Sequence, residues 1–600
     1  MHRNNKLAAT ILFTMLLCLT LLGCRQAPPS TAVPVSQTAV TQTAVPPTPS
    51  RTSPPPATPT QPEATAVPTA TATATPYTPP EHRIAIRQQA GTAQFFVKQA
   101  GEPFVPRGVN YVYVPHNGTM SNLPLKVGLY NPIRTREDFQ ALANLGYNTV
   151  RLFLDACNAG PGCIGDSDNE GLNPAYLDNI TDMLNAAQEA GIYILFTSND
   201  LPDQGGYAEQ ANAQSGETFA GYRNSYYLTP GAVEATKRYW RDLLTGLNER
   251  GAAIDWVLGW QLLNEQWMFL DQPPLSLTSG IVETTTGSYD MSNPEEKEAM
   301  VSDGLIYYIA AIKAEILQHD PTALVTMGFF APEIAAPGWY VDTAPLLAGS
   351  DLDFFDFHAY PGDLPLADYV AAFGMAGYEA KPILLGEYGA FRHIYSELTP
   401  AARAITNWQA ESCAYGFDGW LYWTYYPAAS NVGDRTWGFV DEDQFIMELL
   451  APANQPDPCT AVSLPSANLA YQKPVTASAA LPAEPVSNAV DENEASQWGS
   501  GHDAPQWIEV DLGEATTITE MRLLVAQWPA GETIHRILGG GASGNLVELH
   551  RFQQVTEQGD WLIFIPDSPI ENIQYLRIET ILSPSWVSWG EVQVLGKPTP

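Results

Sequence analysis

Short apolar runs alternate with helix-like segments along the middle of this 600-residue chain, and this alternation constrains the fold most strongly. Each run is almost continuously apolar, which is typical of parallel strands covered on both faces. The predicted strands are Phe104–Val112, Tyr147–Leu154, Ile192–Thr197, Trp256–Leu263, Ala323–Phe329, Leu352–Phe357, Pro382–Gly386 and Gly419–Thr424.

Recognisable helix ends lie between these runs. Pro174 opens a helix with one apolar face, and Gly191 closes it; Pro294 and Pro400 open two others. A doubly wound open sheet would alternate in the same way, but no glycine-rich phosphate turn follows the first strand. The pattern therefore predicts an α/β fold of the TIM or (β/α)8 barrel type with long loops.

Polar and aromatic residues stand where the predicted strands end, which is where barrels of this type carry their chemistry. Ionisable groups at the end of an apolar run are costly unless they are paired or used. In chain order these residues are Arg151, Asn199, Asn264, Glu265 with Trp267 two residues later, His358, Tyr360, Glu387 and Trp423.

Two of these residues, Glu265 and Glu387, follow the fourth and seventh predicted strands. Two carboxyl groups that face each other across a barrel mouth meet the requirement of retaining glycoside hydrolysis. One is protonated to release the leaving oxygen, and the other is ionised and attacks the anomeric carbon. Their separation is then expected to be about 5–5.5 Å.

The chain from about Phe96 to Pro427 resembles the retaining (β/α)8 glycosidases, most of all glycoside hydrolase family 5, the cellulase and mannanase family. The matching segments, in order at strand ends, are Arg107–Asn110, Asn148–Leu152, Asn264-Glu265, His358–Tyr360, Gly386–Gly389 and Trp423. Family members often carry a His after the third strand, where this chain has Asn199. That departure leaves the subfamily open.

The resemblance implies that Glu265 is the acid/base and Glu387 the nucleophile, with no cofactor for catalysis. Asn264 would bind the sugar 2-hydroxyl. Arg151 would hold Glu387 ionised and lower its pKa, and Tyr360 would donate to Glu387.

It also implies that His358 positions Glu265 or the sugar, and that Trp423 forms the floor of the −1 subsite. Each of these residues also has a structural interpretation: Arg151 as a salt bridge at the barrel bottom, His358 as a core histidine, Trp423 as packing. The insertion from Gln266 to Ser292 is expected to cover one side of the cleft, and a pocket formed in this way would favour exo-action.

The C-terminal segment changes pattern after a Pro/Ser-rich linker. Short alternating runs with frequent turns predict an all-β sandwich. The segments Asn468–Ala470, Ala489–Asp491, Gln506–Gly513 and Trp586–Val592 resemble the discoidin-like F5/8 type C fold, a galactose-binding-like jelly roll. Carbohydrate-binding module family 32 is the version attached to glycosidases.

This second resemblance implies a structural Ca²⁺, a cation that prefers oxygen ligands. The matching ligands are the side chains of Asp491, Asn493, Ser496 and Glu591 and the backbone oxygens of Asn488 and Gly590. Glu492 stands where the family usually has glycine, and solvated turn residues without metal are the alternative. Trp528, His502 and Trp586 are candidate sugar contacts, although Trp586 equally fits a core position.

The N-terminus has the layout of a secretory signal, with basic residues before the apolar run Leu7–Leu22. The sequence Leu21-Leu22-Gly23-Cys24 resembles a bacterial lipobox in which Cys24 is acylated, and an ordinary signal peptide is the alternative. The Pro/Thr-rich stretch that follows has no apolar face to bury, which predicts a disordered stalk. We expect an exported, membrane-anchored lipoprotein on the cell surface.

The predicted domain organisation follows from these boundaries. It consists of a lipoprotein signal (1–24), a disordered linker (25–80), a glycoside hydrolase barrel (81–456), a second linker (457–466) and the β-sandwich (467–597).

The net charge narrows the possible binding partners. With 29 Lys and Arg against 65 Asp and Glu, the net charge of −36 disfavours nucleic acid as a partner, whereas neutral polysaccharide is compatible with it.

Four of the six cysteines remain once Cys18 in the signal and Cys24 are set aside. In an exported protein this even number suggests the disulfides Cys157–Cys163 and Cys413–Cys459. Metal binding is the rival interpretation, and no nearby His spacing supports it.

The sequence thus predicts a retaining glycoside hydrolase that cleaves β-linked polysaccharide or oligosaccharide of the β-glucan or β-mannan type. A catalytically silent carbohydrate-binding or adhesion protein and a transglycosylase on the same scaffold are the alternatives. The glycan, the linkage and endo- or exo-action stay open.

Overall fold

A computed structural model describes residues 80–599, apart from 90, 200, 214–218, 220, 333–337, 342, 363, 376–379 and 429–434. The predicted signal, Cys24 and nearly all of the predicted stalk lie outside the described residues. None of the helices in this part of the chain combines the length and the apolar character that crossing a membrane would require.

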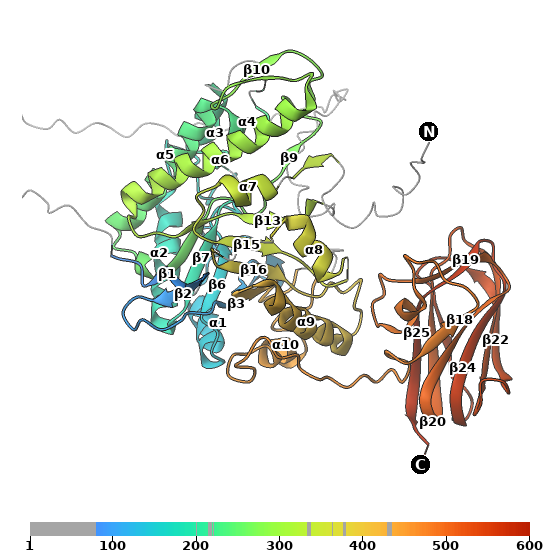
Figure 1. Ribbon diagram of the computed structural model, residues 1–600. Coiled ribbons are helices and arrows are strands. Elements are labelled where there is room, and N and C mark those ends of the chain that lie inside the picture. The colour runs from blue at the N-terminus through green and yellow to red at the C-terminus, as the bar shows by residue number, and fades with distance from the viewer. Residues whose placement is uncertain are drawn as a thin grey trace, which may run out of the picture. The chain divides into compact units, whose positions relative to one another are not determined.

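Parallel strands form a ring in the N-terminal part of the described chain (Figure 1). They are β3 (Arg107–Asn110), β6 (Thr149–Phe153), β7 (Tyr193–Thr197), β8 (Val257–Gln261), β12 (Val325–Thr326), β13 (Gly328–Phe330), β15 (Phe355–His358), β16 (Ile383–Tyr388) and β17 (Gly419–Tyr422). β12 pairs with β8 and β13 pairs with β15, and only Met327 separates the two. They are therefore halves of one strand, which makes the ring eight-stranded and confirms the predicted barrel.

Helices surround the ring (Figure 1). They are α1 (Pro132–Asn144), α2 (Pro174–Ala190), α3 (Tyr207–Ala213), α4 (Ser225–Leu228), α5 (Pro230–Glu249), α6 (Pro294–His319), α7 (Ala344–Gly349), α8 (Leu366–Phe373), α9 (Leu398–Ser412) and α10 (Phe445–Leu449). α2 begins at the predicted proline because the Asn173 side chain accepts the N–H of Ala175, and it ends at Gly191 with φ of 76°. α9 begins two residues before the predicted Pro400.

A hairpin that the sequence did not predict closes the barrel near the amino ends of its strands. It consists of β1 (Ile84–Gln89) and β2 (Thr92–Val97), which pair antiparallel. Ile84 and Phe95 pack with Leu258, Phe354 and Leu421 in one buried cluster. The opposite, carboxyl ends of the strands are thus left for the active site.

The loops after the fourth and fifth strands are joined to each other. β9 (Met268–Phe269) lies in the predicted insertion and pairs antiparallel with β14 (Trp339–Tyr340). The same insertion contains a hairpin of β10 (Ile281–Glu283) and β11 (Ser288–Asp290), and β4 (Val114–His116) and β5 (Thr119–Ser121) form another hairpin after β3. The insertion is therefore held by strand pairing rather than loosely attached.

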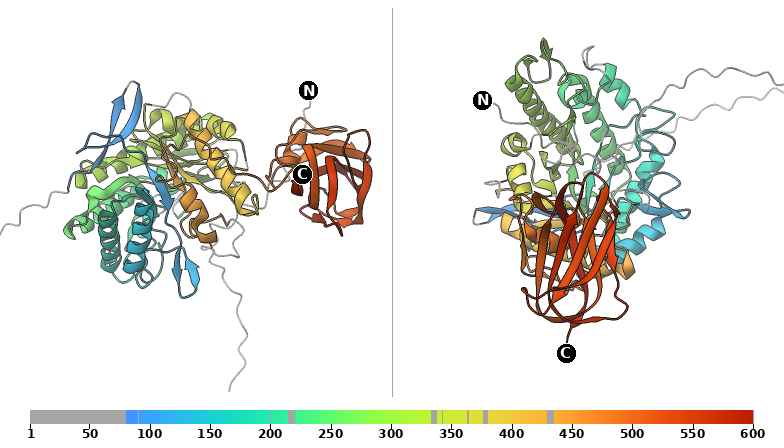
Figure 2. Two further views of the ribbon diagram at one scale, coloured as in Figure 1. Left: turned by 90° about the horizontal axis from the view of Figure 1, so that it is seen from below. Right: turned by 90° about the vertical axis from the view of Figure 1, so that its right-hand side faces the viewer.

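The C-terminal segment forms an antiparallel β-module with its own core, as predicted (Figure 2). Its strands are β18 (Val475–Ala477), β19 (Trp498–Asp503), β20 (Gln506–Val525), β21 (Gly531–Gly540), β22 (Val547–Thr556), β23 (Trp561–Phe564), β24 (Ile570–Leu582) and β25 (Trp586–Pro598). Trp498 and Trp589 are among its largest fully buried side chains.

Gly386 in β16 lies against the buried side chain of Asp356 in the neighbouring β15. A Cβ atom at Gly386 would lie 1.7 Å from Oδ1 of Asp356, far inside van der Waals contact. The glycine before Glu387 is therefore required by the space that this carboxylate occupies.

We expect the substitution Gly386→Ala to destabilise the barrel, because either the Asp356 carboxylate or the β16 backbone must move. Overpacking of this kind costs about 1–3 kcal/mol or more of the free energy of unfolding. The measurement is chemical denaturation of the full chain. Gly544→Ala is the control, since no atom lies within 4 Å of its Cβ position. Equal stability of the two variants would contradict this account of Gly386.

Candidate active site

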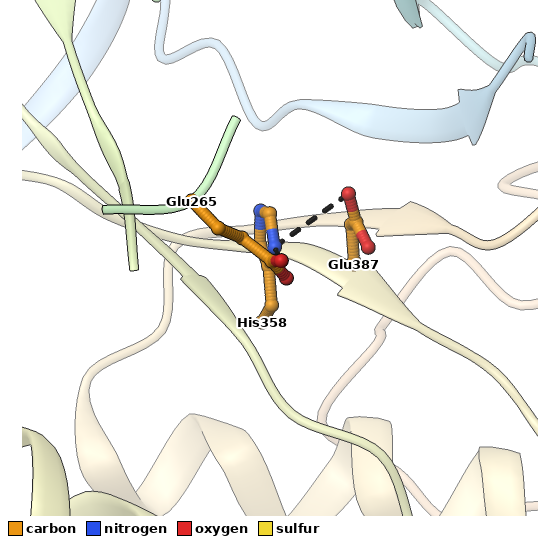
Figure 3. A group of neighbouring side chains, drawn as sticks. All are labelled: Glu265, His358 and Glu387. Carbon is orange, nitrogen blue, oxygen red and sulfur yellow. Dashed lines mark hydrogen bonds and ion pairs between the residues drawn. The ribbon is translucent and has the colours of Figure 1, made fainter. Parts of the chain in front are cut away.

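Two carboxyl groups meet at the carboxyl ends of the barrel strands. Glu265 follows β8, Glu387 lies near the end of β16, and His358 ends β15 (Figure 3). One oxygen of each glutamate and one nitrogen of His358 all lie within 4.8 Å of one another. The Glu265 side chain is 27% exposed and that of Glu387 is 5% exposed. One acid is thus accessible and the other is enclosed.

Arg151 in β6 holds the enclosed acid. Its Nη1 donates to Oε1 of Glu387 at 2.6 Å and to Oδ1 of Asn110 at 2.8 Å, and its Nη2 donates to Oδ1 of Asn264 at 2.6 Å. Its Nε donates to Oε1 of Gln261 at 2.9 Å. The guanidinium is fully buried and lies at the active end of the barrel, not in a salt bridge at the bottom.

Tyr360 and His358 complete the contacts of the two acids. The Tyr360 hydroxyl donates to Oε2 of Glu387 at 2.8 Å. Nδ1 of His358 lies 2.8 Å from Oε1 of Glu265 and 3.5 Å from Oε1 of Glu387. His358 therefore bridges the two acids, and both oxygens of Glu387 have a donor.

The environment shifts the proton affinities of these groups. Burial raises the pKa of Glu387, and the charges of His358 and Arg151 oppose that rise without overcoming it. The sequence had predicted a lowered pKa; the effect of Arg151 has the expected direction, but burial is the larger cause. Burial would lower the pKa of His358, yet Glu387, Asp356 and Glu265 together raise it to about 9. Burial and Glu387 raise the pKa of Tyr360 well above its ordinary value.

Sequence reasoning missed two polar residues beneath the acids, Gln261 in β8 and Asp356 in β15. Nε2 of Gln261 donates to Oδ2 of Asp356 at 2.6 Å, and both residues are fully buried. A signal was present, because Asp356 is a charged residue between two phenylalanines in an apolar strand, on the same side as His358.

The predicted aromatic residues fall into two groups. Trp423 is partly exposed and makes an edge contact with Phe153, with ring centroids 6.4 Å apart. Trp267 is buried instead: it stacks on Trp339 at 4.2 Å, and the Arg223 guanidinium lies 4.0 Å from its ring centroid. Trp267 therefore packs between the joined loops, whereas Trp423 keeps part of its surface exposed.

The remaining predicted barrel residues have local roles. The backbone N–H of Asn199 donates to Oδ1 of Asp155 at 2.7 Å, which fixes the loop after β7. Cys157 is bonded to Cys163, and Cys413 is bonded to Cys459.

The predicted calcium ligands lie together in the β-module. Oδ2 of Asp491 accepts a hydrogen bond from Ser496 Oγ at 2.9 Å, and this hydroxyl also lies 3.2 Å from the backbone oxygen of Asn488. Glu591 is fully buried, and its Oε2 accepts the N–H of Glu492 at 3.1 Å. Glu492 adopts φ of 61°, the left-handed conformation in which the family's glycine is favoured.

Proton affinities in this cluster also reflect burial. Burial raises the pKa of Asp491 to about 6. Burial, followed by the charge of Asp491, raises the pKa of Glu591 well above its ordinary value. A buried and a partly buried acid that repel each other, with further oxygen donors around them, form a donor set that suits a hard dication.

The candidate sugar contacts of the module face outward. Trp528 is 79% exposed and Trp586 is 51% exposed, so Trp586 is not a core residue. His502 is also exposed.

Comparisons with known proteins agree with this two-part organisation. Residues 488–539 match the family model described as "NedA-like, galactose-binding domain". The chain is 25% identical, over 286 residues, to a probable mannan endo-1,4-β-mannosidase C of Aspergillus terreus (strain NIH 2624 / FGSC A1156), a match that covers 41% of this chain and 62% of the relative. The chain thus spans about three fifths of that relative's length.

Two solved structures are also similar. An exo-β-1,4-mannosidase from Opitutaceae bacterium strain TAV5 is 18% identical, with a TM-score of 0.42, and the match covers 62% of this chain and 63% of that one. A chitosan-binding module in complex with chitotriose, from a Paenibacillus sp. IK-5 chitosanase/glucanase, is 27% identical, with a TM-score of 0.18, covering 22% of this chain and all of that one. The chain is thus similar to a probable mannanase over part of its length, and its C-terminal segment matches the model of a galactose-binding domain.

Proposed function

We propose that this protein is a retaining glycoside hydrolase that acts on β-linked polysaccharide or oligosaccharide. One observation carries the proposal: two carboxyl groups have oxygens within 4.8 Å of each other, one enclosed and the other partly exposed. That proximity fits the short separation of retaining enzymes and leaves little room for the water that inverting enzymes place between their acids.

The different surroundings of the two acids divide their roles. Glu387 accepts hydrogen bonds from Arg151 and Tyr360, which hold its carboxylate in place for attack on the anomeric carbon. Glu265 contacts His358 and is partly exposed, so it can exchange protons with solvent. In the first step Glu265 protonates the leaving oxygen while Glu387 forms the glycosyl bond; in the second, Glu265 takes a proton from the attacking water.

Two further groups contribute to sugar binding in this proposal. Arg151 holds the oxygen of Asn264, which leaves the Asn264 amide N–H₂ group to bind the sugar 2-hydroxyl. The partly exposed ring of Trp423 packs against the sugar in the −1 subsite.

The substrate class that we propose to test first is β-mannan, with β-glucan as the second. The name of the Aspergillus relative supports mannan, since that relative is described as a probable mannan endo-1,4-β-mannosidase. The net charge of −36 is compatible with a neutral polymer of either kind.

The remaining parts of the chain have proposed roles in delivery to such a polymer. The β-module would bind carbohydrate through Trp528 and Trp586, and would hold Ca²⁺ through Asp491, Ser496 and Glu591, with Asn493 and the backbone oxygens of Asn488 and Gly590. Acylation of Cys24 would anchor the protein to a membrane at the cell surface, with the predicted stalk as a spacer.

We expect Glu387→Gln to abolish hydrolysis of β-mannan or β-glucan and of aryl β-glycosides, because the amide cannot form the glycosyl ester. Glu265→Ala should lower kcat by about 10²- to 10⁴-fold on polysaccharide and less on aryl glycosides with good leaving groups. Glu283→Gln, an exposed change in the insertion, is the control. Proton NMR of the first product should show the β-anomer.

Four outcomes would count against this proposal. Full activity of Glu387→Gln or an α-anomeric first product would exclude it. A wild-type chain that cleaves nothing in the panel would favour a silent carbohydrate-binding protein, and transfer to sugar instead of water would indicate a transglycosylase.

Trp528→Ala should weaken binding to insoluble mannan or glucan by about 2- to 12-fold, from the 0.5–1.5 kcal/mol that aromatic packing contributes. Hydrolysis of a soluble aryl glycoside should not change. Pull-down isotherms measure the first effect and initial rates the second. Val555→Ala, an apolar side chain 69% exposed in the same module, should leave both unchanged. Unaltered binding by Trp528→Ala would place the sugar site elsewhere.

Removal of calcium with EDTA should lower the unfolding temperature of the β-module, and added Ca²⁺ should restore it. At a hundredfold excess of free ion over Kd, binding stabilises the folded state by about 2.7 kcal/mol. Calorimetry measures the shift. The response should disappear in Glu591→Gln and persist in Asp567→Asn, an exposed change in the same module. A transition that ignores EDTA in the wild type would show that the loop holds no metal.

A further inference from the structure

A third carboxylate lies beneath the two acids and has no role in the mechanism so far. Asp356 is fully buried in β15, and its Oδ2 lies 3.6 Å from Nε of Arg151 and 3.8 Å from Nε2 of His358. Gln261 donates to the same oxygen at 2.6 Å. Among the described residues, neither Nε2 of His358 nor Oδ1 of Asp356 has a hydrogen-bond partner.

A carboxylate thus lies beside each of the two nitrogens of the His358 ring. Nδ1 faces Glu265 at 2.8 Å, and Nε2 faces Asp356 at 3.8 Å. A neutral imidazole has one N–H, so one nitrogen would turn a lone pair toward a carboxylate oxygen. Only the doubly protonated ring presents an N–H to both sides.

We propose that Asp356 is a positioning residue for the acid/base: its negative charge keeps His358 doubly protonated, so that Nδ1–H holds one oxygen of Glu265. The other oxygen of Glu265 is then the one that gives its proton to the leaving group and later takes a proton from water. This inference rests on the proposed function and adds a residue that does not touch the substrate.

The other charged groups around His358 fit this arrangement. Glu387 in β16 lies 3.5 Å from Nδ1 and favours the protonated ring, whereas Arg151 in β6 opposes it. Tyr360 stays neutral because its pKa is raised. The ring therefore faces three acids and one cation, and a net negative surrounding stabilises an imidazolium.

Space in the fold is reserved for this carboxylate. Gly386 has no side chain where Asp356 lies, since a Cβ there would come within 1.7 Å of Oδ1. Gly386, directly before the proposed nucleophile, thus leaves space for Asp356, the carboxylate that we propose as the positioning residue of Glu265. A buried carboxylate without a charged or hydrogen-bonding partner would only destabilise the barrel, because its desolvation would not be offset.

The test is the titration of His358 by NMR of the ¹⁵N-histidine-labelled full chain, with its signal among the nine histidines assigned by its loss in His358→Gln. In the wild type, His358 should be doubly protonated at pH 7.5. In Asp356→Asn, which keeps the shape and an acceptor for Gln261, its pKa should fall by about one unit or more. On polysaccharide, the kcat of Asp356→Asn should fall between pH 6 and pH 8 by more than the kcat of the wild type does, with KM nearly unchanged.

Asp320→Asn is a matched control. Asp320 is another fully buried acid, and it pairs with a histidine, His82, at 2.7 Å near the amino ends of the strands. This variant should lose stability but leave the titration of His358 unchanged.

A wild-type His358 that is neutral at pH 7.5 would overturn the proposal whether or not Asp356→Asn folds. So would an equal His358 pKa in Asp356→Asn and the wild type, or an equal shift in Asp320→Asn. The titration needs no substrate, so an inactive wild-type chain would refute the proposed hydrolase without deciding the role of Asp356.

Discussion

The buried ion pair between Arg151 and Glu387 is the interaction on which the active end of this barrel depends. A single charge enclosed in this way would cost several kcal/mol, so neither group is tolerable without the other. The guanidinium also binds Asn110, Asn264 and Gln261, and it thereby connects β6 to β3 and to the carboxyl end of β8. One cation thus fixes both Glu387, the proposed nucleophile, and Asn264, the residue next to the proposed acid/base.

The same arrangement explains how two glutamates a few ångströms apart take different roles. Glu387 is enclosed, and burial raises its pKa, but the nearby cations limit that rise and the hydrogen bonds fix its orientation. Glu265 reaches solvent and touches the imidazole of His358. Differences in burial and in partner, not in chemical type, distinguish the proposed nucleophile from the proposed proton-transfer group.

The barrel and most of this site could be predicted because both produce recognisable patterns in the sequence. Strands buried on two faces appear as apolar runs, and a residue such as Arg151 or Glu387 is conspicuous at the end of one. The β1–β2 hairpin was missed because two six-residue strands beside a Pro/Thr-rich stretch carry little periodicity. Asp356 was missed because its meaning depends on neighbours from β6, β8 and β16 that only the closed ring brings close. The raised pKa of Glu387 likewise required knowledge of burial, which a motif does not contain.

The charged residues of the site and the stacked Trp267 and Trp339 are held by different means. Arg151, His358 and Glu387 lie on strands, whose hydrogen-bonded ladder fixes them within one ring. Trp267 and Trp339 stack on each other in the two loops that β9 and β14 join, and the first of these loops follows Glu265 in the chain. In the proposed hydrolase, changes in those loops would alter what fits beside Glu265 without moving the Arg151–Glu387 pair. The choice of glycan and of endo- or exo-action would then depend on the joined loops, whereas the chemistry would depend on the strands.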